Sequence, residues 1–302
     1  MFLNAANLRD KVLKKIIAFT VENSRAHHLL PIEDSFKIHN TKALKIITVA
    51  DGITRDPIGL PHLPLSQELI TRIEFVEKYP RPSPAKIAAD TFCRTFISAC
   101  SKEKIVSLGT IANSFSLANS EIQTLNRKNN PHPDYLERDL WGCVASGGII
   151  KNDTLYWGYI CDCGVCIFDK NGILTFRTEN DKDKADKLAD LKGKDWRNPK
   201  WRLERRKEYR NNLDKKVRGR IVSYGAFTGE ENASSFVKTG IQKLYPGDRV
   251  FFYSDGMEKI IFSRAFQKLL VICNWNEIEE QCRILHEAKE GAEATLIGVS
   301  IE

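Results

Sequence analysis

The sequence lacks any run of about 18 consecutive apolar residues, which excludes a membrane-spanning helix on length. Its N-terminal stretch also lacks a basic region followed by an unbroken apolar run, so it does not predict a secretory signal. The overall composition is ordinary, with 42% hydrophobic and 28% charged residues among 302, and such a chain can bury a sizeable core. We therefore expect a cytoplasmic protein.

Cysteine is present, but the setting in which disulfides form is absent. In a chain of this size without a secretory signal, the eight cysteines are expected to be reduced. Cys161, Cys163 and Cys166 have the spacing of a thiolate metal site, yet no Cys/His pair lies close by to complete four ligands. On one strand, moreover, the first two would face one side and Cys166 the other. We predict buried thiols rather than a zinc site, and core positions for four more: Cys93, Cys100, Cys273 and Cys282.

The net charge of +7 is concentrated in one segment. Residues 181–218 contain 15 Lys and Arg against 8 Asp and Glu, whereas the rest of the chain has 31 of each sign. A nucleic-acid-binding protein more often spreads basic and aromatic residues over a folded face, so we do not expect nucleic acid as a partner. We interpret 181–218 as a basic insertion, with a surface helix through Tyr209, Leu213 and Val217. The insertion either selects acidic partners or aids solubility, and the sequence favours neither.

Hydrophobic periodicity predicts strands and helices in separate groups. Strands are predicted near 16–21, 36–38, 45–50, 143–150, 154–160, 173–176, 220–224, 249–253 and 295–301, with 143–176 as one antiparallel meander. Helices are predicted after the N-caps Ser66 and Ser83, at 111–125, and near 257–270 and 275–288, with loop and short helix at 225–240. This order indicates a segregated α+β chain rather than a parallel βαβ sheet.

Two of the predicted strands end in the same dipeptide. One runs into Asp51-Gly52, and the other, after a Pro-Gly turn, into Asp255-Gly256. Each Asp-Gly alone is explained as well by a tight turn. Two strand-terminal carboxylates together supply the oxygen donors that Mg²⁺ or Mn²⁺ prefers, so a divalent-metal site is the hypothesis to test.

In their order and spacing, these motifs resemble the metal-dependent protein phosphatases of type 2C. The resemblance runs from about residue 12 to the end and is carried by Glu33-Asp34-Ser35-Phe36, Val49-Ala50-Asp51-Gly52, Cys161-Asp162-Cys163, 244–256 and 291–297. It implies an α+β fold: a four-layer sandwich of two antiparallel β-sheets flanked by helices, with metals at one end. It also implies a single domain over 1–302, with the basic insertion where relatives carry a mobile flap beside the active site.

The resemblance further implies which residues bind metal: Glu33, Asp34, Asp51, Gly52, Asp162, Asp255 and Glu293. Asp51 would bridge two Mg²⁺ or Mn²⁺ ions beside the Gly52 carbonyl and Asp255, while the acidic pair at 33–34 would hold metal-bound waters. Asp162 would serve a third, weaker ion. Catalysis would rest on Asp34, Asp51 and Asp255, with a water between two ions attacking phosphorus in line. The implied activity is that of a serine/threonine phosphatase acting on phosphorylated proteins.

The sequence departs from the family's pattern at three places. Before its last strand the family has Asp-Asn or Asp-Asp, whereas this chain has Ala292 and Glu293, so one ligand is displaced or missing. The family arginine that grips phosphate is leucine here, and three substitutes stay open: Arg25, His28 and Arg55. The histidine that often follows Asp-Gly is Ile53, which leaves His62 in the next loop. These departures support one alternative, a catalytically impaired phosphatase-fold regulator that binds a partner protein.

Overall fold

The structure is a computed structural model that describes residues 16–22, 31–53, 79–133, 135, 141–193, 199–272, 275–289 and 293–302. The helix expected after Ser66 and the core position expected for Cys273 lie outside these residues. Within the described ranges, no helix is long and apolar enough to cross a membrane.

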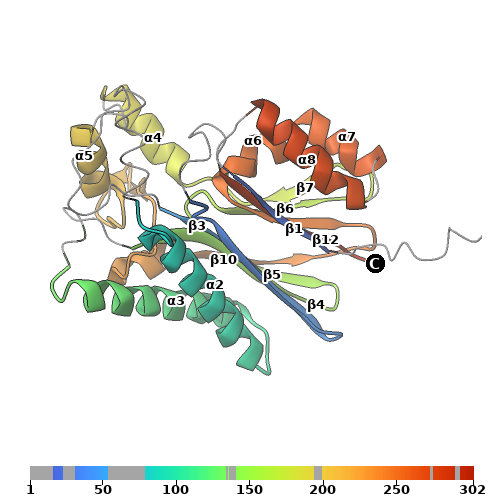
Figure 1. Ribbon diagram of the computed structural model, residues 1–302, viewed down its shortest axis with the longest axis horizontal. Coiled ribbons are helices and arrows are strands. Elements are labelled where there is room, and N and C mark those ends of the chain that lie inside the picture. The colour runs from blue at the N-terminus through green and yellow to red at the C-terminus, as the bar shows by residue number, and fades with distance from the viewer. Residues whose placement is uncertain are drawn as a thin grey trace, which may run out of the picture.

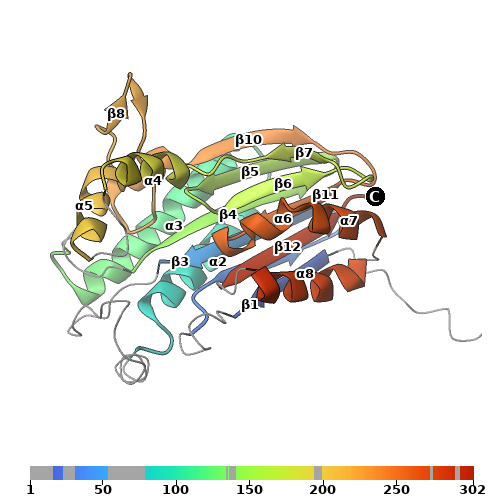
Figure 2. The same cartoon turned by 90° about the horizontal axis from the view of Figure 1, so that it is seen from above.

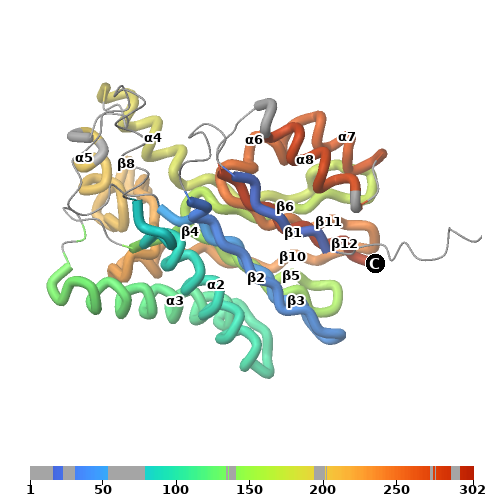
Figure 3. The backbone as a smooth tube through the Cα atoms, viewed as in Figure 1, coloured from blue at the N-terminus to red at the C-terminus, as the bar shows by residue number. Residues whose placement is uncertain are grey.

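Two five-stranded antiparallel sheets form the centre of the molecule. The first sheet has the order β1 (Ile16–Val21), β12 (Ala294–Ser300), β11 (Arg249–Tyr253), β6 (Gly164–Phe168) and β7 (Leu174–Arg177). The second has the order β10 (Lys238–Lys243), β5 (Thr154–Ile160), β4 (Cys143–Lys151), β3 (Leu44–Gly52) and β2 (Ser35–Asn40). Strands from the two ends of the chain, β1 and β12, lie side by side, as Figure 3 shows.

Helices cover the outer face of each sheet (Figure 1). The second sheet packs against α2 (Pro84–Lys102) and α3 (Leu108–Asn129). The first packs against α6 (Glu258–Ile261), α7 (Arg264–Ile272) and α8 (Trp275–Lys289). Helix, sheet, sheet and helix make four layers, which confirms the predicted fold class.

The inner strand β3, which lies between β4 and the edge strand β2, is apolar almost throughout because both of its faces are covered. Ile46 and Ala50 face the helices α2 and α3, whereas Ile47 and Val49 face the other sheet. Because a strand's side chains alternate between its two faces, a strand buried on both sides reads as a continuous apolar run.

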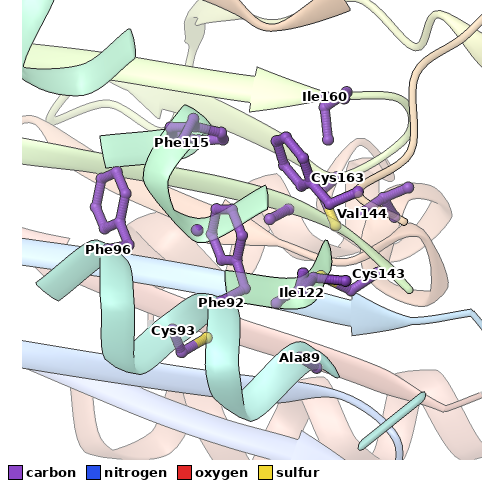
Figure 4. Close-up of a cluster of buried hydrophobic side chains, with 14 of the residues drawn as sticks. Ala89, Phe92, Cys93, Phe96, Phe115, Ile122, Cys143, Val144, Ile160 and Cys163 are labelled. Atoms are coloured by element: carbon purple, nitrogen blue, oxygen red, sulfur yellow. The ribbon is translucent and has the colours of Figure 1, made fainter. Parts of the chain in front are cut away.

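The helix α2 begins where its sequence predicts. Ser83 accepts a hydrogen bond from the Lys86 backbone N–H (3.1 Å) as N-cap, and Pro84 occupies the first helical position. Its buried stripe includes Ala88, Phe92 and Phe96, which repeat at intervals of four residues. The rings of Phe92, Phe96, Phe115 and Phe227 lie with neighbouring centroids 5.1–6.0 Å apart, and Figure 4 shows the cluster that α2 and α3 build over the sheet.

The predicted meander over 143–176 is wrong, because the chain changes sheets within it. The strands β4 and β5 pair in the second sheet, and β6 and β7 pair in the first. The crossing occurs at Cys161-Asp162-Cys163, where Cys161 has a positive φ of 69°. The arrangement of Cys161, Cys163 and Cys166 on one strand is therefore also wrong, although all seven described cysteines are buried and free as predicted.

The basic insertion contains more structure than its sequence indicated. It holds α4 (Lys182–Leu191), α5 (Pro199–Tyr209) and the first strand of a hairpin of β8 (Lys216–Val217) and β9 (Arg220–Ile221). The predicted helix from Tyr209 to Val217 is wrong, because α5 ends at Tyr209 and the chain turns back at Arg218 and Gly219, both with positive φ. The hairpin projects from the rest of the molecule in Figure 2.

The strand predicted at 220–224 is shorter in the structure, where β9 contains only Arg220 and Ile221. At 225–240 the expected short helix is present as the 3₁₀ helix η2 (Glu231–Phe236), and the edge strand β10 that follows was not predicted. Two of the six β10 residues are Lys, and none of the six is buried, so the strand carries little apolar signal.

The aromatic cluster under α2 predicts a large penalty for truncation. Phe92→Ala removes a fully buried ring that contacts three others, and we expect the free energy of unfolding to fall by about 3–5 kcal/mol. Denaturation by urea measures this loss. The matched control is Leu117→Ala on α3, which is 47% exposed and should stay within about 0.5 kcal/mol of the parent. Equal losses in both variants would contradict the assigned core.

Candidate functional site

Acidic residues from both sheets gather at one end of the sandwich. The acidic pair, Glu33 and Asp34, comes just before β2, whose first residue pairs with a residue near the end of β3, where Asp51 lies. Asp255 follows β11, and Glu293 precedes β12, the antiparallel neighbour of β11. Antiparallel pairing places the end of one strand beside the start of the next, which is why residues so distant in sequence meet here. Asp162 joins them from the turn between β5 and β6.

Glu293 is fixed against the acidic pair. Its Oε1 accepts hydrogen bonds from the backbone N–H groups of Glu33 (2.8 Å) and Asp34 (2.6 Å). A side chain at 293 would face away from the site if it belonged to the last strand, but β12 begins one residue later. Glu293 therefore lies outside the strand's alternation, and its carboxylate turns toward the cluster.

Neighbouring hydroxyl groups orient both members of the acidic pair. The carboxylate of Glu33 accepts hydrogen bonds from the hydroxyls of Tyr79 (2.7 Å) and Ser83 (2.5 Å), and Ser83 is also the N-cap of α2. Asp34 accepts one from the Ser254 hydroxyl (2.7 Å), which in turn accepts from the Thr295 backbone N–H (2.8 Å). Each carboxylate is thus held by groups from another element.

Both glycines of the two Asp-Gly dipeptides are points of close backbone contact. A Cβ at Gly52 would lie 2.7 Å from the Glu33 carbonyl oxygen and 2.9 Å from the Ala85 backbone. A Cβ at Gly256 would lie 2.0 Å from the Glu293 carbonyl oxygen. These distances are shorter than real contacts allow, so glycine lets the strand ends, α2 and the acidic residues approach one another.

The negative charges perturb one another. Desolvation raises the pKa of Asp51 well above its usual range, and the charges of Asp34, Asp255 and Asp162 raise it further. Desolvation, followed by the charge of Glu293, likewise raises the pKa of Asp34, while its bond from Ser254 acts in the opposite direction. Burial raises the pKa of Glu293 to about 7. Each of these carboxyl groups is an oxygen donor that would be stabilised in its charged form by a cation.

Lys182 brings a positive charge to Asp162. The Lys182 ammonium lies 2.6 Å from Oδ2 of Asp162, which is only 5% exposed. Burial alone would raise the pKa of Asp162, but the charge of Lys182 and the hydrogen bonds from Lys182, Cys161 and the backbone together outweigh it and bring that pKa below its usual value. The charge of Asp162 raises the pKa of Lys182 in return. Asp162 is therefore the carboxylate whose charge the protein itself balances.

The donor chemistry fits hard divalent cations. The residue Asp51 is half-buried and Asp255 is exposed, so ions can reach this end of the sandwich, and the charges of neighbouring carboxylates act on Asp51. Among the described residues, no three Asp, Glu, His or Cys side chains already surround one point as a complete ligand group. The oxygen donors come from neighbouring strand ends, but a metal-ligand geometry is not preassembled among the described residues.

Several residues of this site were missed by the sequence analysis. Tyr79, Ser83 and Ser254 act as hydroxyl donors, and single hydroxyl residues carry no sequence signal of their own. Lys182 lies in a charge run that is typical of a solvated helix. Five residues named at the departures from the family's pattern lie outside the described residues: Arg25, His28, Arg55, His62 and Ala292.

Solved structures share this architecture over nearly the whole chain. The serine/threonine phosphatase PstP of Mycobacterium tuberculosis matches with a TM-score of 0.59 and 15% identity, covering 95% of this chain and 98% of that one. A catalytic domain of PstP described in complex with two manganese ions matches with a TM-score of 0.58 and the same identity and coverage. The serine/threonine phosphatase of S. agalactiae matches with a TM-score of 0.61 and 14% identity, covering 95% and 99%. RsbX in complex with magnesium matches with a TM-score of 0.52 and 11% identity, covering 94% and 92%.

These likenesses establish the fold. The chain has the type 2C phosphatase-like fold, as its sequence motifs predicted, with two antiparallel five-stranded sheets between helices. No family model matches the sequence, and no curated protein matches it.

Ser254 generates a stability prediction, because it is fully buried and bonded on both sides. Ser254→Ala leaves the Thr295 N–H without its acceptor and removes a donor from Asp34, so we expect a loss of about 1–3 kcal/mol in the free energy of unfolding. Chemical denaturation in chelator measures it without interference from metal. Ser116→Ala, on the exposed side of α3, is the control and should change little. A loss no larger than the control's would show that Ser254 does not hold the acidic pair.

Proposed function

We propose that this protein is a metal-dependent serine/threonine phosphatase acting on phosphorylated proteins. One observation carries the proposal: in a chain with this fold, the charges of Asp34 and Asp255 act on Asp51, at the place where the resemblance to type 2C phosphatases implies a metal centre. Asp51, the Gly52 carbonyl and Asp255 would hold Mg²⁺ or Mn²⁺ directly. The acidic pair and Glu293 would hold the waters around them.

Bound ions would acidify a water and neutralise charge on the phosphoryl group during in-line displacement. The chain's own residues keep the donors in place for this task. Tyr79 and Ser83 keep the Glu33 carboxylate as an acceptor, and Ser254 does the same for Asp34. Because both donors to Glu33 come from residues leading into α2, the helix and the site are positioned together.

The basic insertion would select the substrate. Residues 216–221, which we call the basic hairpin, hold Lys216, Arg218 and Arg220 with no acidic residue, and all three side chains are exposed on a projecting arm. A concentrated positive charge attracts negatively charged partners and speeds their association. We infer that phosphorylated proteins with acidic surroundings are preferred.

The alternative, a regulator that keeps the fold without hydrolysis, has one observation in its favour. Oε1 of Glu293 is engaged by the backbone amides of Glu33 and Asp34, so part of the carboxylate nearest the family's last ligand position serves the backbone. A protein of this kind would bind a partner and show no turnover.

The first test is the hydrolysis of an aryl phosphate by the purified protein in Mn²⁺, Mg²⁺ or chelator. We expect turnover that requires metal and falls by on the order of 100-fold or more in Asp51→Asn, because the bridging charge is lost. Asp153→Asn is the matched control, since Asp153 is an exposed carboxylate in a hairpin turn, paired with Lys243. Absence of turnover on aryl phosphates and phosphopeptides, with no metal binding by calorimetry, would favour the regulator.

A second test concerns the basic hairpin. In the triple variant Lys216→Ser, Arg218→Ser, Arg220→Ser, kcat/KM for an acidic phosphopeptide should fall by on the order of tenfold at low salt, because attraction at long range is lost. Turnover of a small aryl phosphate should not change. Lys102→Ser with Lys104→Ser removes exposed charge at the C-terminal end of α2 and serves as control. Equal losses on both substrates would refute substrate selection by the hairpin.

A further inference from the structure

Lys182 is the point at which the basic insertion reaches the acidic cluster. It is the first residue of α4, and its ammonium lies 2.6 Å from Oδ2 of Asp162. The Lys182 side chain is 40% exposed and the Asp162 side chain only 5% exposed. The aliphatic part of the lysine therefore runs inward from the surface and delivers its charge to a buried carboxylate.

The backbone around Lys182 is fixed by bonds to other elements. The Asp181 N–H donates to the carbonyl of Cys161 (3.0 Å), in the same turn that carries Asp162. Asn180 accepts from the backbone N–H of Lys182 (3.1 Å) and donates to Glu258 of α6 (3.0 Å). Lys182 is thus held in position by the fold, unlike a surface lysine that happens to meet an acid.

The ion pair of Lys182 and Asp162 lies where a positive charge is favourable. Asp162 adds negative charge to both Asp51 and Asp255, and Lys182 opposes that charge at both positions. A buried carboxylate requires a partner, and an ammonium at hydrogen-bond distance supplies it without any ion from solution. Lys182 therefore performs at Asp162 the electrostatic task that a bound cation would perform.

We propose that the Lys182 ammonium takes the cation position at Asp162, so that no third divalent ion binds there and the protein works with two. The inference rests on the proposed function for those two ions, but it concerns Asp162 alone. Lys182 is a positioning residue: it neutralises Asp162 and, because it begins α4, ties the insertion to the site. An ion at Asp162 would have to displace the lysine ammonium.

The experiment counts Mn²⁺ bound per full-length chain, using the paramagnetic resonance signal of free Mn²⁺ during titration. The parent should bind two ions, which are lost in Asp51→Asn. Lys182→Met, which keeps the length and removes the charge, should bind one more ion. Lys182→Arg keeps the charge and should match the parent, as should Lys184→Met, a control on the same helix whose exposed lysine pairs with Glu179.

The additional ion should disappear when Asp162→Asn is combined with Lys182→Met, which assigns it to that carboxylate. Circular dichroism establishes that each variant is folded, and Lys182→Gln replaces the Met variant if the latter is not. The same number of ions in the parent and in the folded Lys182 variant would overturn the inference and leave the proposed function standing. An ion that binds only in the Lys182 variant and needs Asp162 would support the inference and overturn the two-ion function. Absence of binding in every protein would overturn both.

Discussion

The carboxylate of Glu293 accepts the backbone N–H groups of both Glu33 and Asp34, and this contact joins the two sheets at the end that carries the acidic cluster. Glu293 leads into β12 of the first sheet, and the acidic pair leads into β2 of the second. A parallel link runs from Ser254, after β11, to Asp34. The positions of the carboxylates are therefore a property of the junction between the sheets rather than of either sheet alone.

That junction holds like charges together. Asp34 and Asp51 are kept in an environment that disfavours their charged forms, through desolvation and through neighbouring carboxylates. The folded chain sustains this because hydroxyl donors and backbone amides fix the acidic groups, and because Lys182 balances Asp162. The electrostatic repulsion that remains between Asp51 and its neighbouring carboxylates favours the binding of a divalent cation, because the positive charge reduces that repulsion.

Much of this fold could be predicted, because its strands and helices carry strong periodic signals. The strand ending in Asp51-Gly52 is apolar on both faces, and Ser83-Pro84 begins α2 as capping chemistry requires. The turn at Cys161 could not be predicted, since an apolar sequence does not reveal that it leaves one sheet for another. Lys182 was missed for a related reason: a basic residue in a charge run reads as solvated unless its buried partner is known. The spacing of Tyr209, Leu213 and Val217 gave a false helical period across a hairpin.

In the two Asp-Gly dipeptides, the glycines and the aspartates are under different constraints. Each glycine is required by packing, since a methyl group at either position would collide with the backbone of Glu33 or Glu293. Packing does not account for either aspartate in this way; under the proposed function, each is required for the metal ion that its carboxylate would hold. A descendant that lost its chemistry would therefore retain the glycines and drift at the aspartates. The proposed function therefore implies that, in a comparison of related chains, the aspartates rather than the glycines distinguish an active centre from a retained fold.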